Sequence, residues 1–101
     1  MPTKITVIID TPADAAAFEK DYSDIAELAG KLPELRRAES AKVWPHEDGT
    51  PTPKHRTLDL YFDSYDDASA AVTTPAAGAF FQRLGGTGTP FTALFSDVVA
   101  A

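Results

Sequence analysis

The sequence predicts an α+β domain in which a four-stranded antiparallel sheet carries its helices on one face, in the order β-α-β-β-α-β. Three observations lead to this fold class. Several short segments alternate apolar and polar side chains as half-buried strands do. Two longer segments begin with residues that cap helices and then show apolar spacings of three and four. The chain has 101 residues, which is the size of one domain, so residues 1–101 are assigned to one domain.

The first strand is expected over Lys4–Asp10, which is β-branched almost throughout. A helix is expected to follow because Thr11 can cap it, Pro12 suits the first helical position, and Asp14 lies three residues after the cap. Pro33 should end the helix, since proline disfavours helical geometry in the residue before it. One stripe of the helix faces a core, and it consists of Phe18, Tyr22, Ile25, Leu28, Ala29 and Leu32.

The second strand is expected over Arg36–Trp44, and its loose alternation suits the edge of the sheet. Pro45–Lys54 contains three prolines and a glycine. Because proline has no amide hydrogen for a sheet ladder, this segment should be a loop that joins two strands. The third strand is expected over Thr57–Asp63, with Leu58, Leu60 and Phe62 toward the core.

Ser64, followed by two aspartates, predicts the start of a short helix whose body is Ala68–Thr73. Thr74 and Pro75 restart the pattern, and a second helical piece should run through Leu84 until the two glycines at 85 and 86 stop it. The last strand is expected over Phe91–Val98. This order of elements is that of the ferredoxin-like fold.

Helices can cover only one face of such a sheet. The other face carries Ile8, Tyr61 and Leu94 among polar side chains, which is more apolar than a wet surface requires. We therefore expect a second copy of the chain to cover it, giving a homodimer of the dimeric α+β barrel type. The alternative is a half-polar face in contact with solvent.

Composition excludes several classes of function. The chain has no cysteine, which excludes disulfides, a thiolate nucleophile and thiolate-bound zinc or iron–sulfur clusters. The net charge is −6 and the basic residues are scattered, so nucleic acid is not expected as a partner. The longest apolar run, Val7–Ile9, is far shorter than the ~20 residues of a membrane span, and the polar start Met1–Lys4 is unlike a signal peptide. We expect a cytoplasmic protein without a membrane partner.

Four segments together resemble the EthD family, which takes its name from an ethyl tert-butyl ether degradation protein. They are Phe18–Leu35, Leu58–Ser64, Thr74–Pro75 and Thr92–Val98, and they span nearly the whole chain. The resemblance implies a small dimeric α+β barrel protein. That superfamily also contains heme-degrading and cofactor-free monooxygenases, muconolactone-type isomerases and polyketide cyclases, so the fold is implied more firmly than the reaction.

The family motif that could carry chemistry, His-x-Pro-Leu in the first helix, is lost in this chain. In register with Leu28, its histidine falls on Ile25 and its proline on Glu27. An isoleucine cannot move protons, so the acid–base role of that histidine is not available at this position. The aspartate of the second helix falls on Gln82 or Arg83, and the family's glycine turn corresponds to residues 85–89. The chain resembles a divergent member.

Some residues could still form a site. His46 and His55 flank the proline-rich loop, and with Glu47 and Asp48 they could bind a metal, but two solvated histidines are the favoured interpretation, so no metal is expected. The glycine turn at residues 85–89 follows a helix, which is the reverse of a phosphate-binding loop. Tyr22 and Asp59 are weak candidates for catalysis.

Apolar side chains could line a ligand pocket, the usual place for an apolar ligand being between the helices and the sheet. The candidates are Tyr22, Ile25, Trp44, Leu60, Tyr61, Phe80 and Phe81. The simpler interpretation, favoured for Ile25, Leu60 and Phe80, is that they are core, whereas Trp44 could lie at a pocket mouth or an interface. Three functions stay open: a homodimer that binds a small hydrophobic or aromatic metabolite without a cofactor, a cofactor-free enzyme of the monooxygenase, isomerase or cyclase type, and a structural dimer with a closed core.

Overall fold

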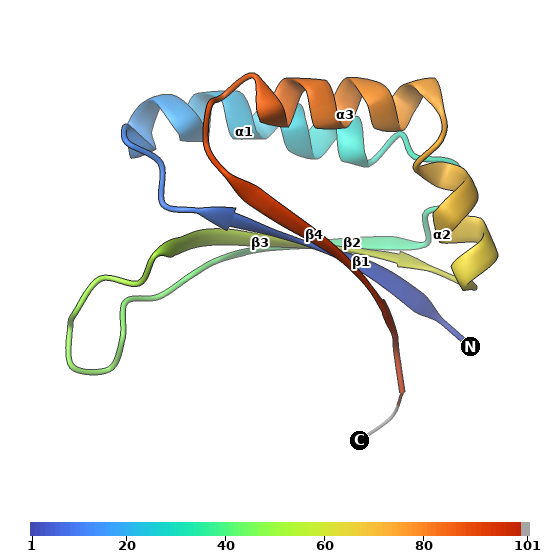
Figure 1. Cartoon of the computed structure of the whole chain (residues 1–101), viewed down its shortest axis with the longest axis horizontal. Coiled ribbons are helices and arrows are strands. Elements are labelled where there is room, and N and C mark those ends of the chain that lie inside the picture. Colours follow the sequence, from blue (N-terminus) through green and yellow to red (C-terminus); the bar gives the residue numbers. More distant parts are fainter. Residues whose placement is uncertain (100–101) are drawn as a thin grey trace.

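The computed structural model describes residues 1–99 and confirms the predicted fold class. Its strands form an antiparallel sheet in the order β2-β3-β1-β4, and its helices lie on one face (Figure 1). In chain order the elements are β1 (Thr3–Asp10), α1 (Ala15–Ala29), β2 (Arg37–Lys42), β3 (Lys54–Phe62), α2 (Tyr65–Ala71), α3 (Pro75–Gly85) and β4 (Phe91–Asp97). None of the helices in this part of the chain has the length and apolar character needed to cross a lipid bilayer.

The core lies between the sheet and the helices. Central strand β1 pairs with β3 and β4, and the register sets Ile5 beside Leu60 and Val7 beside Leu58. Because side chains alternate across a strand, these residues all point to the helix side, where they are buried. The opposite side chains of β1 and β3 are partly exposed, as the alternation predicts.

Helix α1 begins later than its sequence predicts. Asp14, not Thr11, is the N-cap, and its carboxylate accepts a hydrogen bond from the Ala17 N–H at 3.1 Å. Thr11 does not cap the helix, because it bonds to the loop before β3. Its N–H donates to Pro53 O at 2.8 Å, and its hydroxyl donates to Thr52 O at 3.1 Å. The helix also ends earlier, at Ala29 with Gly30 as C-cap. The prediction that it runs to Pro33 was therefore wrong, although Leu32 still joins the core.

In the hairpin of β2 and β3, strand β3 begins earlier than predicted and β2 ends earlier. Strand β3 begins at Lys54, which was expected in the loop, because Lys54 pairs with Asp10 both in the register and through an ion pair of 2.7 Å. Strand β2 ends at Lys42 rather than Trp44 and lies at the edge of the sheet, as expected, with every residue exposed. The loop of this hairpin extends away from the helices (Figure 1).

The later elements follow the predicted caps. The hydroxyl of Ser64 accepts the Asp67 N–H at the start of α2, and the hydroxyl of Thr74 accepts the Ala77 N–H at the start of α3, with Pro75 in the first turn. Helix α3 includes Gly85 and is capped by Gly86. Strand β4 forms the other edge of the sheet and ends at Asp97, one residue before the predicted Val98.

Candidate functional site

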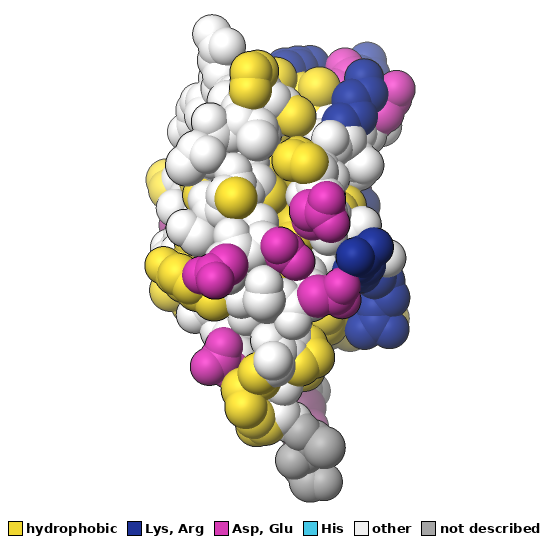
Figure 2. Space-filling view, turned by 90° about the vertical axis from the view of Figure 1, so that its right-hand side faces the viewer, with side chains coloured by type: hydrophobic (Ala, Val, Ile, Leu, Met, Phe, Trp, Pro, Cys, Tyr) yellow, Lys and Arg dark blue, Asp and Glu magenta, His cyan; other side chains and the backbone are white. Residues whose placement is uncertain are grey.

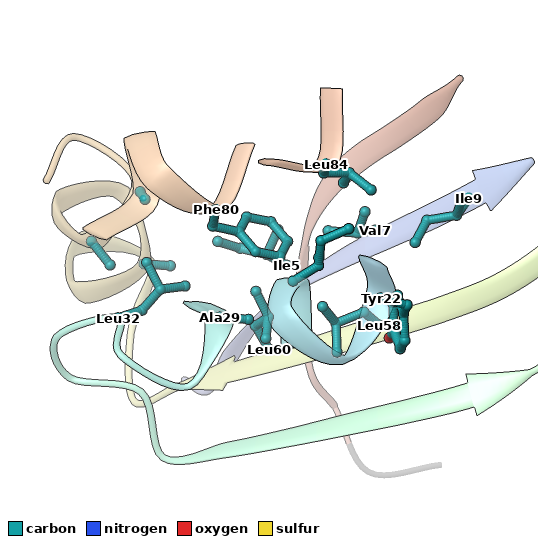
Figure 3. Close-up of a cluster of buried hydrophobic side chains, with 14 of the residues drawn as sticks. Ile5, Val7, Ile9, Tyr22, Ala29, Leu32, Leu58, Leu60, Phe80 and Leu84 are labelled. Atoms are coloured by element: carbon teal, nitrogen blue, oxygen red, sulfur yellow. The ribbon is translucent and has the colours of Figure 1, made fainter. Parts of the chain in front are cut away.

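Four of the residues predicted to line a pocket lie together in the core. Ile25, Leu60 and Phe80 are fully buried, and Tyr22 is nearly so. Figure 3 shows Tyr22, Leu60 and Phe80 gathered between the helices and the sheet. Phe81 is partly buried beside them and contacts Phe80 edge-to-face, with ring centroids 4.9 Å apart. Packing therefore accounts for these side chains in the described chain.

The other two predicted pocket residues lie elsewhere. Trp44 is 85% exposed on the β2–β3 hairpin. It lines a hollow of about 420 Å³ with Lys42, Val43 and Pro45, so one segment supplies all of its walls. Tyr61 lies on the sheet face away from the helices, as its place opposite Leu60 in the alternation requires. The structure does not bring Trp44 or Tyr61 to the other five.

That open sheet face carries a polar network. Asp59, a weak candidate for catalysis, accepts a hydrogen bond from the Thr6 hydroxyl at 2.5 Å, and the Lys4 ammonium lies 3.7 Å from it. The Tyr61 hydroxyl donates to Glu39 at 2.8 Å, and the Arg37 guanidinium lies 4.3 Å from the centre of the tyrosine ring. Asp59 and Glu39 share this face because they pair across β3 and β2. The carboxylates here are already engaged within one chain.

A second polar cluster ties α1 to the hairpin on the helix side. Glu19 accepts hydrogen bonds from Arg56 Nε at 2.9 Å and Nη2 at 2.6 Å. These hydrogen bonds lower the pKa of Glu19 from 4.5 to about 2, although burial acts in the opposite direction, and they raise the pKa of Arg56. The Tyr22 hydroxyl is 2.6 Å from Ser40 Oγ, and the Arg56 guanidinium lies 4.3 Å from the centre of the Tyr22 ring. The phenol of Tyr22, the other candidate for catalysis, is therefore engaged in contacts that join α1 to β2 and β3.

His55 belongs to this cluster, which corrects the prediction of two solvated histidines. Its Nε2 lies 3.4 Å from Glu19 Oε2, its ring contacts Phe18 edge-on, and its side chain is mostly buried. His46 is exposed and starts the turn of the loop, where its C=O accepts the N–H of Gly49. The two histidines are not brought together, and residues 1–99 contain no group of three or more metal-ligating side chains placed to share an ion.

The structure also contains a hollow that the sequence did not predict, with walls from two parts of the chain. It has a volume of about 340 Å³ and lies between the start of α1 and the loop that leads from α3 into β4. From α1 it is lined by Asp14, Ala17, Phe18 and Asp21, and from the loop by residues 87–90. Phe18 forms its inner wall, since it is buried and stacks on Tyr22 with centroids 5.8 Å apart. We call this space the α1 hollow.

The loop side of the α1 hollow is shaped by the glycine turn. Gly88 has a φ of 75°, a left-handed conformation that favours glycine. The Thr87 hydroxyl donates to Leu84 O at 2.7 Å and accepts the Thr89 N–H at 3.2 Å, which fixes the turn. The sequence predicts residues 85–89 only as a turn. The signal that could have found the hollow is the placement of this turn directly before β4, the strand that pairs with β1 where α1 begins.

A further hollow, of about 190 Å³, lies at the other end of the molecule beside the aromatic pair Tyr65 and Phe95, whose centroids are 5.6 Å apart. Figure 2 shows the side of the molecule facing right in Figure 1, where hydrophobic and acidic side chains are interspersed rather than gathered in one patch. This hollow is about half the volume of the α1 hollow. We therefore take the α1 hollow as the candidate site.

No family model matches this sequence. An uncharacterized 11.0 kDa protein in the thcB-thcC intergenic region of Rhodococcus erythropolis is 32% identical over 73 residues, which cover 71% of this chain and 70% of that protein. An EthD family protein from Bacillus halodurans superposes with a TM-score of 0.88 at 20% identity, covering 98% of this chain and 100% of that one.

Two further solved structures share the fold. SnoaB, a cofactor-independent oxygenase from Streptomyces nogalater, has a TM-score of 0.72 at 11% identity, with 99% and 95% of the two chains covered. A dimeric ferredoxin-like protein of unknown function from Thermobifida fusca has a TM-score of 0.74 at 13% identity, with 97% and 92% covered. At these identities the likeness establishes the fold and leaves the activity open.

Proposed function

We propose that this chain, which belongs to the family of the uncharacterized 11.0 kDa Rhodococcus protein, forms a homodimer that binds a small hydrophobic or aromatic metabolite. This function is the one that its EthD-like fold suggests. The resemblance to the EthD family that its sequence predicts is confirmed at the level of the fold. The proposal has two parts, a ligand site in each subunit and a dimer interface, and each rests on a different surface.

The single observation that carries the ligand site is the α1 hollow. Its volume of about 340 Å³ lies at the lower end of the usual range for small-molecule sites, ~300–1,000 Å³. Phe18 and Ala17 offer an apolar wall, and Tyr22 stands directly behind Phe18. Tyr22, one of the predicted pocket residues, would thus support the site from behind, while the ligand rests between helix and loop.

The dimer is supported by the open sheet face. Leu94 is 48% exposed on it and pairs with Thr6, next to Ile8 on the central strand. A second sheet laid against this face would remove these apolar side chains from water, which is the main driving force for association. The description of the Thermobifida protein as dimeric points the same way.

The ligand site is tested by filling the α1 hollow. Ala17→Phe places a ring in it, whereas Ala16→Phe places the same ring one residue earlier on α1, outside the lining. Titrating aromatic probes such as benzyl alcohol by NMR should give saturable shifts at residues 87–90. Ala17→Phe should weaken binding by about tenfold or more, ~1.4 kcal/mol, and Ala16→Phe should not. If no aromatic probe produces saturable shifts in the wild type, the structural dimer with a closed core replaces this proposal. If both variants bind the probe alike, the α1 hollow is not the site.

The dimer is tested by Leu94→Arg, which places a charge on the open face. The control is Ala93→Arg on the helix side of the same exposed strand. Sedimentation of the wild type and the control should give twice the chain mass of 10.8 kDa, and Leu94→Arg should give a folded single chain. A wild type that sediments as one folded chain at micromolar concentration contradicts the dimer.

Cofactor-free catalysis on an aromatic or lactone substrate is the second candidate, and the likeness to the oxygenase SnoaB favours it. The chain lacks the family histidine at Ile25, and Tyr22 and Asp59 are held by other side chains. Ile25→His tests whether only the acid–base group is missing. Gain of turnover on a family-type substrate would support catalysis, whereas an inactive variant that still folds and binds the probes would count against it.

A further inference from the structure

The charged side chains that line the α1 hollow are all acidic. Asp14 and Asp21 line it, and its lining contains no lysine, arginine or histidine. The remaining lining is apolar or neutral, with Pro12, Ala13 and Ala17 on one side and the turn at residues 87–90 on the other. A carboxylate or phosphate ligand would therefore meet no counter-charge here.

The α1 side of the hollow is a stripe along the helix. Asp14, Ala17, Phe18 and Asp21 follow the spacing of three, four and seven residues that places side chains on one helix face. The two carboxylates are two turns apart, ~10 Å at 1.5 Å per residue, with Ala17 and Phe18 between them. An aromatic ring resting on Ala17 and Phe18 would have a carboxylate beyond each edge.

The two carboxylates are not equivalent. Asp21 is neutralised by Arg83, whose Nη2 lies 2.8 Å from Asp21 Oδ1 and 3.4 Å from Asp24 Oδ2. Asp14 uses one oxygen to accept the Ala17 N–H, and no cationic side chain within residues 1–99 forms an ion pair with it. The helix dipole contributes a positive charge of only ~0.5 at this end. The full charge of Asp14 exceeds it, so this end of the hollow stays negative.

The loop side provides a polar group that is not otherwise used. Thr89 is only 8% exposed and lines the hollow. Its N–H donates to Thr87 Oγ1, while its own hydroxyl forms no hydrogen bond within the described residues. No buried side-chain polar atom of the described residues lacks a partner, so this hydroxyl is reached by water, which a ligand in the hollow would replace.

We propose that the ligand of the α1 hollow is an aromatic amine, with its ring on Ala17 and Phe18, its ammonium beside Asp14, and Thr89 hydrogen-bonding to it from the loop. This inference rests on the proposed binding of an aromatic ligand in that hollow and names its chemical class. Both the apolar wall and the unpaired carboxylate are needed, because either one alone would accept a wider range of compounds.

The test compares three probes of nearly equal size, benzylamine, benzyl alcohol and benzoate, by NMR titration at neutral pH. Benzylamine should bind most tightly and benzoate least. Asp14→Asn removes the charge and keeps a side chain that caps helices about as well as aspartate. Since two charges 4 Å apart interact by ~1 kcal/mol in water, the variant should bind benzylamine about fivefold more weakly and benzyl alcohol unchanged.

Glu27→Gln is the matched control, because it removes one negative charge from the exposed side of the same helix. It should leave all three probes unaffected. If benzyl alcohol binds as tightly as benzylamine and Asp14→Asn changes neither, the amine proposal is overturned while the binding site stands. If none of the probes, benzyl alcohol included, gives saturable shifts at residues 87–90, the proposed function itself fails.

Discussion

Replacing Glu19 with glutamine is expected to destabilise the fold in a way that depends on pH. Glu19 lies on α1, and the residues that hold it, Arg56 and His55, lie on β3. Two hydrogen bonds from one guanidinium, at 2.9 and 2.6 Å, give a bidentate pair that connects the first helix to the hairpin. Glutamine keeps the size of the side chain but loses the charge.

The expected magnitude follows from the pKa of Glu19, which Arg56 lowers from 4.5 to about 2. At ~1.4 kcal/mol per pKa unit this shift corresponds to at most ~3.4 kcal/mol of stabilisation. The side chain is 29% exposed, so water screens part of the interaction. We therefore expect Glu19→Gln to lower the free energy of unfolding by about 1–2 kcal/mol at neutral pH.

The sign of the pH dependence is fixed by the direction of the shift. Because the pKa of Glu19 is lower in the folded state, its contribution is complete above about pH 4.5 and disappears as the pH falls toward 2. Urea unfolding of the wild type and Glu19→Gln at several pH values should show their difference shrinking over this interval. Glu27→Gln on the same helix should give no comparable difference. A gap between wild type and Glu19→Gln that stays constant from pH 7 to pH 2 would refute the argument.

Two other variants test the core and the caps. Phe80→Ala removes a fully buried ring between α3 and the sheet and should cost ~3–5 kcal/mol in urea unfolding; a loss below ~1 kcal/mol would mean that the interior is not packed around it. Ser64→Ala removes the N-cap of α2 and should cost ~1 kcal/mol, whereas Ser64→Asn, which can cap, should cost little. Equal losses for both Ser64 variants would show that capping is not the reason.

The fold could be predicted because its signals are local. The alternation of Ile5, Val7 and Ile9 is enough to assign one face of β1 to the core, and the structure buries these three side chains. The caps at Ser64 and Thr74 are likewise set by residues within one turn. Such features depend on neighbours in the sequence, so they can be inferred without knowing the remainder of the chain.

The start of α1 shows where local signals fail. Thr11 and Asp14 are both capping residues, and Pro12 favours the earlier start. The choice is made by Thr52 and Pro53 in the loop before β3, whose carbonyl oxygens accept hydrogen bonds from Thr11 and keep it outside the helix. The later start also gives Asp14 its place at the mouth of the α1 hollow, so this long-range contact helps to define the candidate site.

The Glu19 cluster could not be predicted for a related reason. Strict alternation along β3 would set His55 and Arg56 on opposite faces of the sheet. The register shifts between Ile9 and Asp10, so that Arg56 pairs with Ile9 and Lys54 with Asp10, and His55 is the extra residue of a bulge. Both side chains therefore reach Glu19 on the helix side.

This bulge also bears on where chemistry could occur. A histidine at the fully buried position of Ile25 would be driven toward its neutral form by desolvation. His55 instead lies beside the carboxylate of Glu19, and its ring contacts Phe18, the inner wall of the α1 hollow, edge-on. A proton-transfer group of this chain should therefore be sought near the start of α1, where the His55 ring contacts Phe18, and not at the position that the family motif indicates.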